Sequence, residues 1–183
     1  ISTFGVPNYF GPQRFGREGD NVRRGLRLLK KEKKEKNPFL RSLYLNSVQS
    51  ALFNRVVGSR VEDGLFSSLL SGDVLQDRST HLLSICSEPE LGCSRLKEDK
   101  VAIMAPLFGV KCPKAKDEVA ARELKALRDF SLELKDFKDF SRLVPGHRRP
   151  VKLLPTNCRF ETVQGKWDVS FSLPPGAYAT TVL

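Results

Sequence analysis

Histidine and cysteine are scarce in this chain, whose 183 residues include two histidines and four cysteines. No two cysteines form a C-x-x-C pair, and the one histidine near them, His81, lacks the spacing of a zinc ligand. The sequence also lacks a serine or cysteine setting for a histidine-based catalytic triad. We therefore expect no metal site and four reduced, mostly buried thiols, at Cys86, Cys93, Cys112 and Cys158.

Long hydrophobic runs are absent as well. No apolar segment approaches the ~20 residues that a transmembrane helix needs, and the first residues have neither the basic start nor the apolar stretch of a secretory signal. With 40% hydrophobic and 28% charged residues, the chain can bury the core of one domain or of two small ones. We expect a soluble, cytoplasmic, monomeric protein without a membrane partner.

Basic residues are concentrated near the N-terminus. The net charge is +10, and residues 1–36 carry ten Lys or Arg against four Asp or Glu. An ordinary solvated surface is one interpretation, but an excess of one sign favours a polyanionic partner. Nucleic acid fits better than an acidic membrane, because the apolar stripe in this segment is narrow. We expect RNA phosphates to contact Arg23, Arg24, Arg27, Lys30, Lys31, Lys33 and Lys34.

The spacing of apolar residues predicts a mixed α+β (α/β) chain. Val22, Leu26 and Leu29 predict a helix over 22–36, and Asn37-Pro38 is typical of the start of the next helix. Alternation over 166–173 predicts a strand with one buried face. The other predicted features are a helix cap at Asp20 or Asn21, a helical turn at 65–70, strands at 74–75, 81–86, 101–104 and 159–163, helices at 116–130 and 134–140, a loop at 145–150, and a hairpin turn at Gln164-Gly165.

A dense cluster of aromatic, amide and basic residues spans positions 6–16. Aromatic rings can stack on bases, amides can hydrogen-bond to base edges, and an arginine can contact phosphate. A core-lining loop whose aromatics simply pack is an equally good interpretation of the composition. Gly11 and Gly16 have the spacing of a P-loop, but Arg17-Glu18 stands where Lys-Ser/Thr is required, so a nucleoside triphosphate site is excluded.

Three segments in this order resemble signatures of the TruD family of transfer-RNA pseudouridine synthases. Residues 7–16 (PNYFGPQRFG) resemble the first signature, and residues 39–54 (FLRSLYLNSVQSALFN) resemble the first helix of the family's inserted domain. Residues 171–180 (FSLPPGAYAT) resemble the closing signature. Gly72-Asp73 and the segment 105–109 (APLFG) also fall in the expected order, so the resemblance covers essentially the whole chain.

The resemblance implies a domain organisation. The family's catalytic domain has a pseudouridine-synthase fold with a mixed, largely antiparallel sheet, and an α/β TRUD domain is inserted into it. Residues 1–36 and 151–183 would then be two pieces of the catalytic domain, and 37–150 the insert. Asn37-Pro38 and Pro150 mark the same boundaries by their turn chemistry.

The resemblance also implies an activity. Such enzymes detach a uracil from its ribose, rotate it and rejoin it through carbon, using one aspartate and no cofactor, and the expected target is uridine 13 of tRNA. The uridine must first leave its stack. By motif match, Asn8 orients groups around the aspartate, while Phe10 and Tyr178 face the flipped base. Gln13 and Arg14 complete the expected substrate-binding set.

The catalytic aspartate itself is not expected within these residues. The family carries it in a Gly-x-Lys-Asp-Arg motif, which does not occur here, and Asp77-Arg78 lacks the preceding Gly-x-Lys. Ile1 in place of a methionine, and Leu183 within an apolar segment, predict a piece of a longer protein, with the aspartate upstream of Ile1. This piece would be inactive alone. A non-catalytic RNA-binding protein of the same fold is the alternative, and a protein-interaction module is a weaker one.

Overall fold

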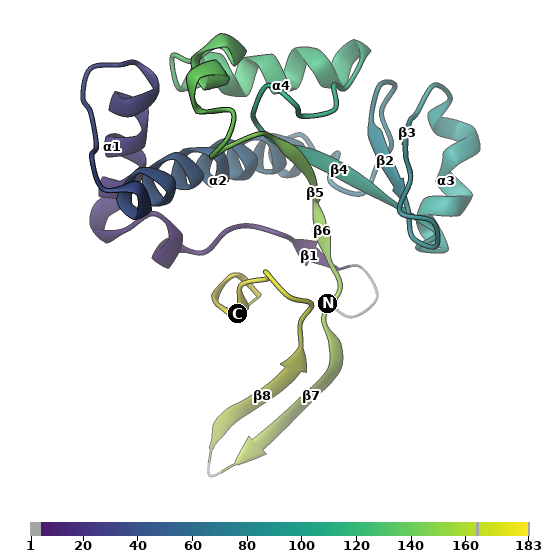
Figure 1. Ribbon diagram of the computed structural model, residues 1–183. Coiled ribbons are helices and arrows are strands. Elements are labelled where there is room, and N and C mark those ends of the chain that lie inside the picture. The colour runs from purple at the N-terminus through teal and green to yellow at the C-terminus, as the bar shows by residue number, and fades with distance from the viewer. Residues whose placement is uncertain (1–4, 164, 183) are drawn as a thin grey trace.

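An antiparallel sheet packed with long helices forms the body of the molecule, and a separate hairpin extends from it (Figure 1). The computed structural model describes residues 5–163 and 165–182. Its mixed α+β architecture confirms the predicted fold class. The α-helices are α1 (Asp20–Leu29), α2 (Pro38–Glu62), α3 (Pro89–Lys97) and α4 (Asp117–Asp129). The strands are β1 (Val6–Pro7), β2 (Val74–Asp77), β3 (Leu83–Ile85), β4 (Val101–Leu107), β5 (His147–Pro150), β6 (Lys152–Leu153), β7 (Thr156–Val163) and β8 (Lys166–Ser172). Short 3-10 helices lie at Pro12–Arg14, Arg17–Gly19, Leu134–Phe140 and Ala179–Thr181.

The main sheet has the strand order β3-β2-β4-β5, and all its pairs are antiparallel. Strand β4 is buried along its whole length because both of its faces are covered. Its odd-numbered residues join the main core with α2, whereas Ala102 and Met104 join a smaller core that includes Val119 of α4. The predicted strand at 101–104 is confirmed, and it continues to Leu107, where β5 pairs with it.

Helix α2 begins where the sequence predicts it. The side-chain oxygen of Asn37 accepts hydrogen bonds from the backbone N–H groups of Phe39 (2.9 Å) and Leu40 (3.3 Å), and Pro38 occupies the first helical position. The helix packs against α1 on one side and β4 on another. Together these elements form the main core of the body.

The predicted helix over 22–36 is wrong in its second half. Helix α1 ends at Leu29, and Lys31 adopts a left-handed backbone conformation with φ of 60°. Every residue from 30 to 36 is charged, so a longer helix would have no apolar face to bury. The lysines from position 30 onward therefore lie on a turn and an irregular segment, and not on a helix face.

Residues 145–150 include a strand where the sequence predicts only a loop. Strand β5 pairs with β4, and the Arg148 side chain that it carries is buried. The guanidinium of Arg148 donates to both carboxylate oxygens of Glu123 (2.5 and 3.0 Å) and to the carbonyl of Met104 (3.1 Å). Partners 25 and 44 residues away hold this segment, so its local turn chemistry does not decide its structure.

Other local predictions differ in extent. Helix α3 is not predicted, because it has no buried residue and therefore no apolar stripe. The residue that caps α1 is Gly19, and not Asp20 or Asn21 as predicted. The predicted helical turn at 65–70 consists of turns without a helix, and the strand predicted at 81–86 is shorter, at Leu83–Ile85. Gln164 of the predicted hairpin turn lies outside the described residues.

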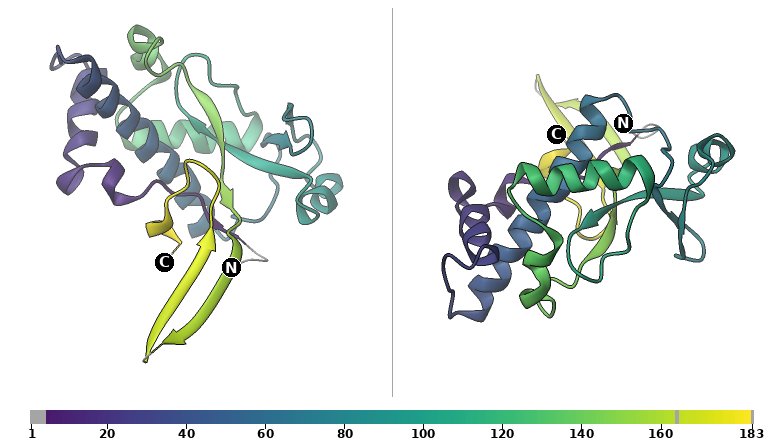
Figure 2. Two further views of the ribbon diagram at one scale, coloured as in Figure 1. Left: turned by 60° about the horizontal axis from the view of Figure 1, so that its bottom comes forward. Right: turned by 90° about the horizontal axis from the view of Figure 1, so that it is seen from above.

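The predicted hairpin is confirmed, but its predicted burial is wrong. Phe160 lies opposite Val169, and Thr162 lies opposite Trp167, so these four side chains share one face of β7 and β8. Trp167 is 76% exposed and Phe160 is 55% exposed. Figures 1 and 2 show the hairpin extending away from the sheet and helices. No other strand of the described chain pairs with it.

A short antiparallel ladder joins β1, near the N-terminus, to β6, which follows β5. Val6 of β1 pairs with Leu153 of β6, and Pro7 pairs with Lys152. The segment that follows β1 therefore runs beside the residues that follow β5. This pairing places the signature at 7–16 next to positions more than 130 residues further along the chain.

Candidate functional site

Asn8 lies at the centre of the candidate site, immediately after β1. Its backbone N–H donates to the carbonyl of Val151 (2.8 Å), and its side-chain nitrogen donates to the carbonyl of Pro150 (2.9 Å). The residue is 7% exposed. Because the amide nitrogen is bound to backbone, the side-chain oxygen Oδ1 is turned toward the guanidinium of Arg149.

Arg149 connects Asn8 to the closing segment. Its Nη2 donates to Oδ1 of Asn8 (2.6 Å) and to the carbonyl of Gly176 (3.0 Å). Its guanidinium carbon lies 4.3 Å from the centroid of the Phe10 ring. Burial lowers the pKa of Arg149 from its ordinary value, and the nearby Arg14 lowers it further. The group stays charged because an arginine pKa begins so high.

Phe10 is the aromatic centre of the cluster. Its ring meets Phe53 edge-on (centroids 5.5 Å apart, 86° between planes) and Tyr178 in the same manner (5.6 Å, 62°). The side chain of Asn54 holds its backbone, since Oδ1 accepts from the Phe10 N–H and Nδ2 donates to its carbonyl, both at 2.9 Å. Phe10 is 8% exposed, whereas Tyr178 and Arg149 are half-buried and therefore more accessible to solvent.

Gln13 and Arg14 border the same cluster. Nε of Arg14 donates to Oγ of Ser50 (3.2 Å), and its guanidinium lies 5.8 Å from the Phe10 ring. The hydroxyl of Thr180 lies 3.4 Å from Oε1 of Gln13, to which it donates. The structure therefore brings together all five residues of the predicted substrate-binding set: Asn8, Phe10, Gln13, Arg14 and Tyr178.

Sequence reasoning missed Arg149, Phe53 and Asn54. Phe53 and Asn54 lie inside the second matching segment, but the spacing of that segment predicts a helix and gives no sign of a support for Phe10. Arg149 lies in the predicted loop, where its only signal is the Arg148-Arg149 pair. That pair does not indicate that one arginine faces the core and the other faces Asn8, an alternation that follows from the strand.

A hollow of about 270 Å³ opens beside this cluster. Asn8, Arg149, Lys152 and Ala177 contribute to its lining. The one carboxylate among its lining residues, Asp99, accepts a hydrogen bond from Arg78 (3.1 Å). The site therefore offers amide, aromatic and cationic groups, which are the kinds of group that can bind and orient a ligand. Among its described residues it holds no unpaired carboxylate that could act as a nucleophile or base.

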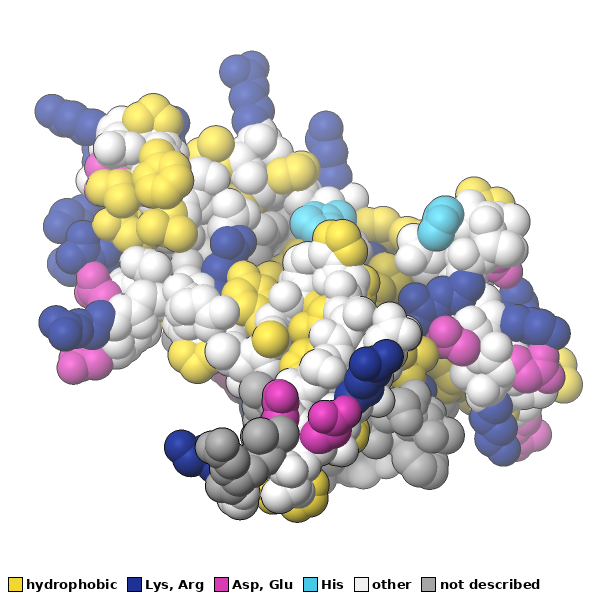
Figure 3. Space-filling model, turned by 90° about the horizontal axis from the view of Figure 1, so that it is seen from below, with side chains coloured by type: hydrophobic (Ala, Val, Ile, Leu, Met, Phe, Trp, Pro, Cys, Tyr) yellow, Lys and Arg dark blue, Asp and Glu magenta, His cyan; other side chains and the backbone are white. Residues whose placement is uncertain are grey.

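The predicted phosphate-binding residues lie on a separate surface, formed by α1 and the segment after it. Five of them, together with two acidic residues, line a shallow hollow of about 440 Å³. Figure 3 shows Lys and Arg side chains gathered along this side of the molecule. The cations in the lining are Arg23, Arg24, Arg27, Lys30 and Lys33.

Several of these cations already have acidic partners. Asp20 pairs with Arg24 (2.6 Å) and lies 3.8 Å from Arg23, while Glu32 lies 4.0 Å from Arg27. Lys31 is paired with Asp139 (2.6 Å). Within the described part of the chain, Lys30, Lys33 and Lys34 make no ion pair. The unpaired lysines are therefore the part of this surface best able to meet a polyanion.

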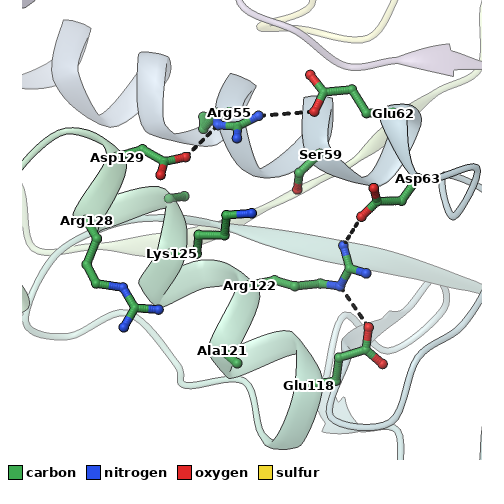
Figure 4. A pocket seen from close by; sticks show the side chains of 11 residues that line it. Arg55, Ser59, Glu62, Asp63, Glu118, Ala121, Arg122, Lys125, Arg128 and Asp129 are labelled. Atoms are coloured by element: carbon green, nitrogen blue, oxygen red, sulfur yellow. Dashed lines mark hydrogen bonds and ion pairs between the residues drawn. The ribbon is translucent and has the colours of Figure 1, made fainter.

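A third hollow, of about 430 Å³, lies between α2 and α4 (Figure 4). Arg55 of α2 donates a hydrogen bond across the hollow to Asp129 of α4 (2.8 Å) and another along α2 to Glu62 (3.2 Å). Arg122 of α4 likewise donates to Asp63 across this groove and to Glu118 along α4. Each of the four carboxylates that line the groove is therefore paired with an arginine. Two of these pairs, Arg55–Asp129 and Arg122–Asp63, connect the two helices, so we interpret the groove as a structural contact.

Two further findings concern metal and membrane. The described residues contain no group of three or more His, Cys, Asp or Glu side chains placed to hold a metal ion. None of the helices in residues 5–163 and 165–182 is long and apolar enough to cross a membrane.

Comparisons with known proteins give a consistent result. The family model described as tRNA pseudouridine synthase D (TruD) matches residues 33–183. The tRNA pseudouridine synthase D of Anaeromyxobacter sp. (strain Fw109-5) is 35% identical over 189 residues, covering 100% of this chain and 54% of the relative. That of Thermus thermophilus is 36% identical over 184 residues, covering 100% and 50%. This chain thus spans about half the length of these relatives.

A solved structure is similar over nearly the whole chain. It is the crystal structure of a protein from Methanosarcina mazei assigned as tRNA pseudouridine synthase D. The TM-score is 0.75 at 23% sequence identity, over 98% of this chain and 60% of the other. At that identity the likeness concerns the fold, and it agrees with the mixed α+β architecture of this chain.

Proposed function

Because this chain belongs to the TruD family of tRNA pseudouridine synthases, we propose that it is part of an enzyme that isomerises a uridine of tRNA to pseudouridine. The proposed target is uridine 13, in the cytoplasm, and the reaction needs no cofactor. The observation that carries this proposal is the convergence of Asn8, Phe10 and Tyr178 around Arg149. Three segments that are distant in sequence form one site there.

The proposed role of this site is to hold the flipped base. Tyr178 supplies most of the stacking surface, and Phe10 supports it through their edge contact and offers the part of its own ring that stays exposed. Gln13 is exposed and can hydrogen-bond a base edge, and Arg14 lies beside it. The amide of Asn8 orients neighbouring groups at the reacting centre.

The chemical step exchanges one glycosidic bond for another within the same nucleotide. The bond from ribose C1′ to N1 of uracil breaks, the base rotates, and a bond from C1′ to C5 forms while the proton on C5 is lost and N1 gains one. We place the aspartate that drives this step outside these 183 residues, because the chain has no Gly-x-Lys-Asp-Arg motif. The chain itself binds and orients.

We further propose that residues 1–36 and 151–183 belong to the catalytic domain and 37–150 to an inserted one. Two observations support this. The ladder between β1 and β6 joins the first piece to the last. The exposed apolar face of β7 and β8, which includes Trp167, is typical of a surface that packs against further chain.

The unpaired lysines at positions 30, 33 and 34 are proposed to contact the tRNA backbone. Phosphate contacts supply affinity and orientation without selecting a sequence. Their separation from the Phe10 cluster suits a substrate as large as tRNA, which can meet both surfaces at once.

The experiment that tests the function uses the longer protein that contains this chain. Purified protein is incubated with a tRNA transcript that has uridine at position 13, and with a matched transcript that has cytidine there. Pseudouridine is then mapped by carbodiimide modification and primer extension. We expect a stop at position 13 in the first transcript only. Tight tRNA binding without pseudouridine at any position would overturn the proposal and favour a non-catalytic RNA-binding protein.

A further inference from the structure

Arg149 connects segments of the chain that are far apart in sequence. One nitrogen, Nη2, bridges the side chain of Asn8 and the carbonyl of Gly176, which are 168 residues apart in sequence. The planar group also lies over the ring of Phe10 at 4.3 Å and near that of Phe53 at 5.6 Å. A single side chain thus contacts both signature segments and the helix beneath them.

The burial of this charge is only partly compensated. Nε of Arg149 is buried and has no hydrogen-bond partner among the described residues. Desolvating a guanidinium is unfavourable unless pairing or ring contacts offset it, and no carboxylate is bonded to Arg149 in the described chain. In its neighbour Arg148, in contrast, every side-chain nitrogen donates a hydrogen bond, and two of the four bonds go to the carboxylate of Glu123. An unpaired cation beside a substrate pocket is typical of functional placement.

We propose that Arg149 is a positioning residue of the isomerase, which fixes the amide of Asn8, the ring of Phe10 and the closing segment at Gly176 in one arrangement around the flipped base. This inference rests on the proposed function. Arg149 acts through its neighbours: its hydrogen bond holds Oδ1 of Asn8 from the side opposite to the bond with Pro150, and its guanidinium lies over the ring of Phe10. Its bond to Gly176 sets the distance between Tyr178 and the first signature.

Arginine suits this task better than lysine. Its planar fork can stack on a ring and donate in the ring plane at the same time, whereas an ammonium is a point donor. A lysine at position 149 would keep a cation near Phe10 but would not make the same bridge between Asn8 and Gly176. Arg149→Lys and Arg149→Met therefore separate the charge from the bridge.

The test measures kcat and KM for tRNA in the longer protein, first for the wild type. For Arg149→Met we expect kcat to fall about 10- to 100-fold, with KM changed less than about threefold, because the groups are misplaced but binding remains. Arg149→Lys should recover only part of the loss. Asn8→Ala combined with Arg149→Met should lose less than the product of the two separate losses, because both variants remove the Asn8–Arg149 contact. Arg128→Met, on α4, is the matched control and should keep the wild-type kcat.

Three outcomes would overturn the inference. A rise in KM with unchanged kcat would make Arg149 a substrate contact, and additive effects with Asn8→Ala would separate the two residues. A lower melting temperature with normal kcat per folded molecule would make its role structural. An inactive wild type would overturn the proposed function together with the inference, whereas an active wild type with any of these results would overturn the inference alone.

Discussion

Arg60 and Asp73 form a doubly hydrogen-bonded ion pair that is almost completely excluded from solvent. Nη1 of Arg60 lies 2.7 Å from Oδ1 of Asp73, and Nη2 lies 3.1 Å from Oδ2, with side chains that are 4% and 1% exposed. Arg60 also donates to the carbonyl of Ser68 (2.6 Å), and Asp73 accepts from the N–H of Leu70 (2.8 Å). The pair ties the end of α2 to the turn that precedes β2, which explains the Gly72-Asp73 motif structurally.

Asp73→Ala is expected to destabilise the fold by about 3–5 kcal/mol, because it leaves the Arg60 charge buried without its partner. The free energy of unfolding is measured by urea titration followed by circular dichroism. Asp99→Ala serves as the matched control, since its pair with Arg78 is largely exposed and should contribute at most about 1 kcal/mol. Equal losses for the two variants would contradict this account of the motif.

Gly72→Ala is expected to be much more harmful than the same change at another left-handed glycine. Gly72 has φ of +89°, and an added Cβ would overlap the carbonyl of Lys116, whose N–H in turn donates to Gly72 (3.1 Å). Gly64 has φ of +70° but nothing within 4 Å of such an atom. Gly64→Ala should therefore lose only about 1 kcal/mol, and Gly72→Ala at least about 1–3 kcal/mol more. Thermal unfolding of the two variants compares them directly.

Lysines of the basic surface should differ in their effect on RNA binding. Lys33→Ala or Lys34→Ala should each reduce the slope of log affinity against log salt by about 0.7–0.9, the loss expected for one phosphate contact. Lys31→Ala should change the slope less, because Lys31 is already paired with Asp139. Filter binding of tRNA at several salt concentrations measures the slopes. An unchanged slope for all three variants would remove this surface from the RNA interface.

The contribution of Tyr178 to turnover should depend on its aromatic ring and not on its hydroxyl. Tyr178→Phe keeps the edge contact with Phe10 and is expected to retain turnover within about threefold. Tyr178→Leu removes the stacking surface, which is worth about 1–3 kcal/mol for a base on an aromatic ring, and should lower kcat/KM correspondingly. Single-turnover assays on the longer protein compare the variants. Full activity of Tyr178→Leu would exclude stacking on this side chain.

His147 should titrate below its ordinary pKa of 6.5. His147 keeps some exposed surface, but the surrounding protein removes part of the water around its imidazole, and this desolvation lowers the pKa. The positive charge of Arg149 lowers the pKa further. The folded-state pKa lies below the unfolded value, so the contribution of neutral His147 to stability is complete above about pH 6.5 and is lost as the pH falls through the folded-state pKa. NMR titration of the ring protons measures it. Arg149→Met should raise this pKa, because it removes the positive charge beside the imidazole. An unchanged pKa would show that the two groups are not coupled.

Local chemistry accounts for the elements that the sequence predicts well. Asn37 and Pro38 start α2 because a side-chain oxygen and a missing N–H suit the first turn of any helix. The alternating residues before and after Gly165 form a hairpin for an equally local reason. The signature at 7–16 can also be recognised from the sequence alone, because it consists of particular residue types at fixed spacings.

Tertiary structure decided what depends on partners far along the chain. Whether β5 forms depends on its pairing with β4, because its own residues have the turn chemistry of a loop. The same is true of Arg149, because the strand turns its side chain toward Asn8, 141 residues away, and the opposite way from Arg148. The sequence by itself therefore determined the family, the start of the longest helix and the set of residues that we propose to bind the substrate. Only the tertiary structure decided which arginine joins those residues, because the contacts of Arg149 are with residues far away in sequence and no local pattern predicts them.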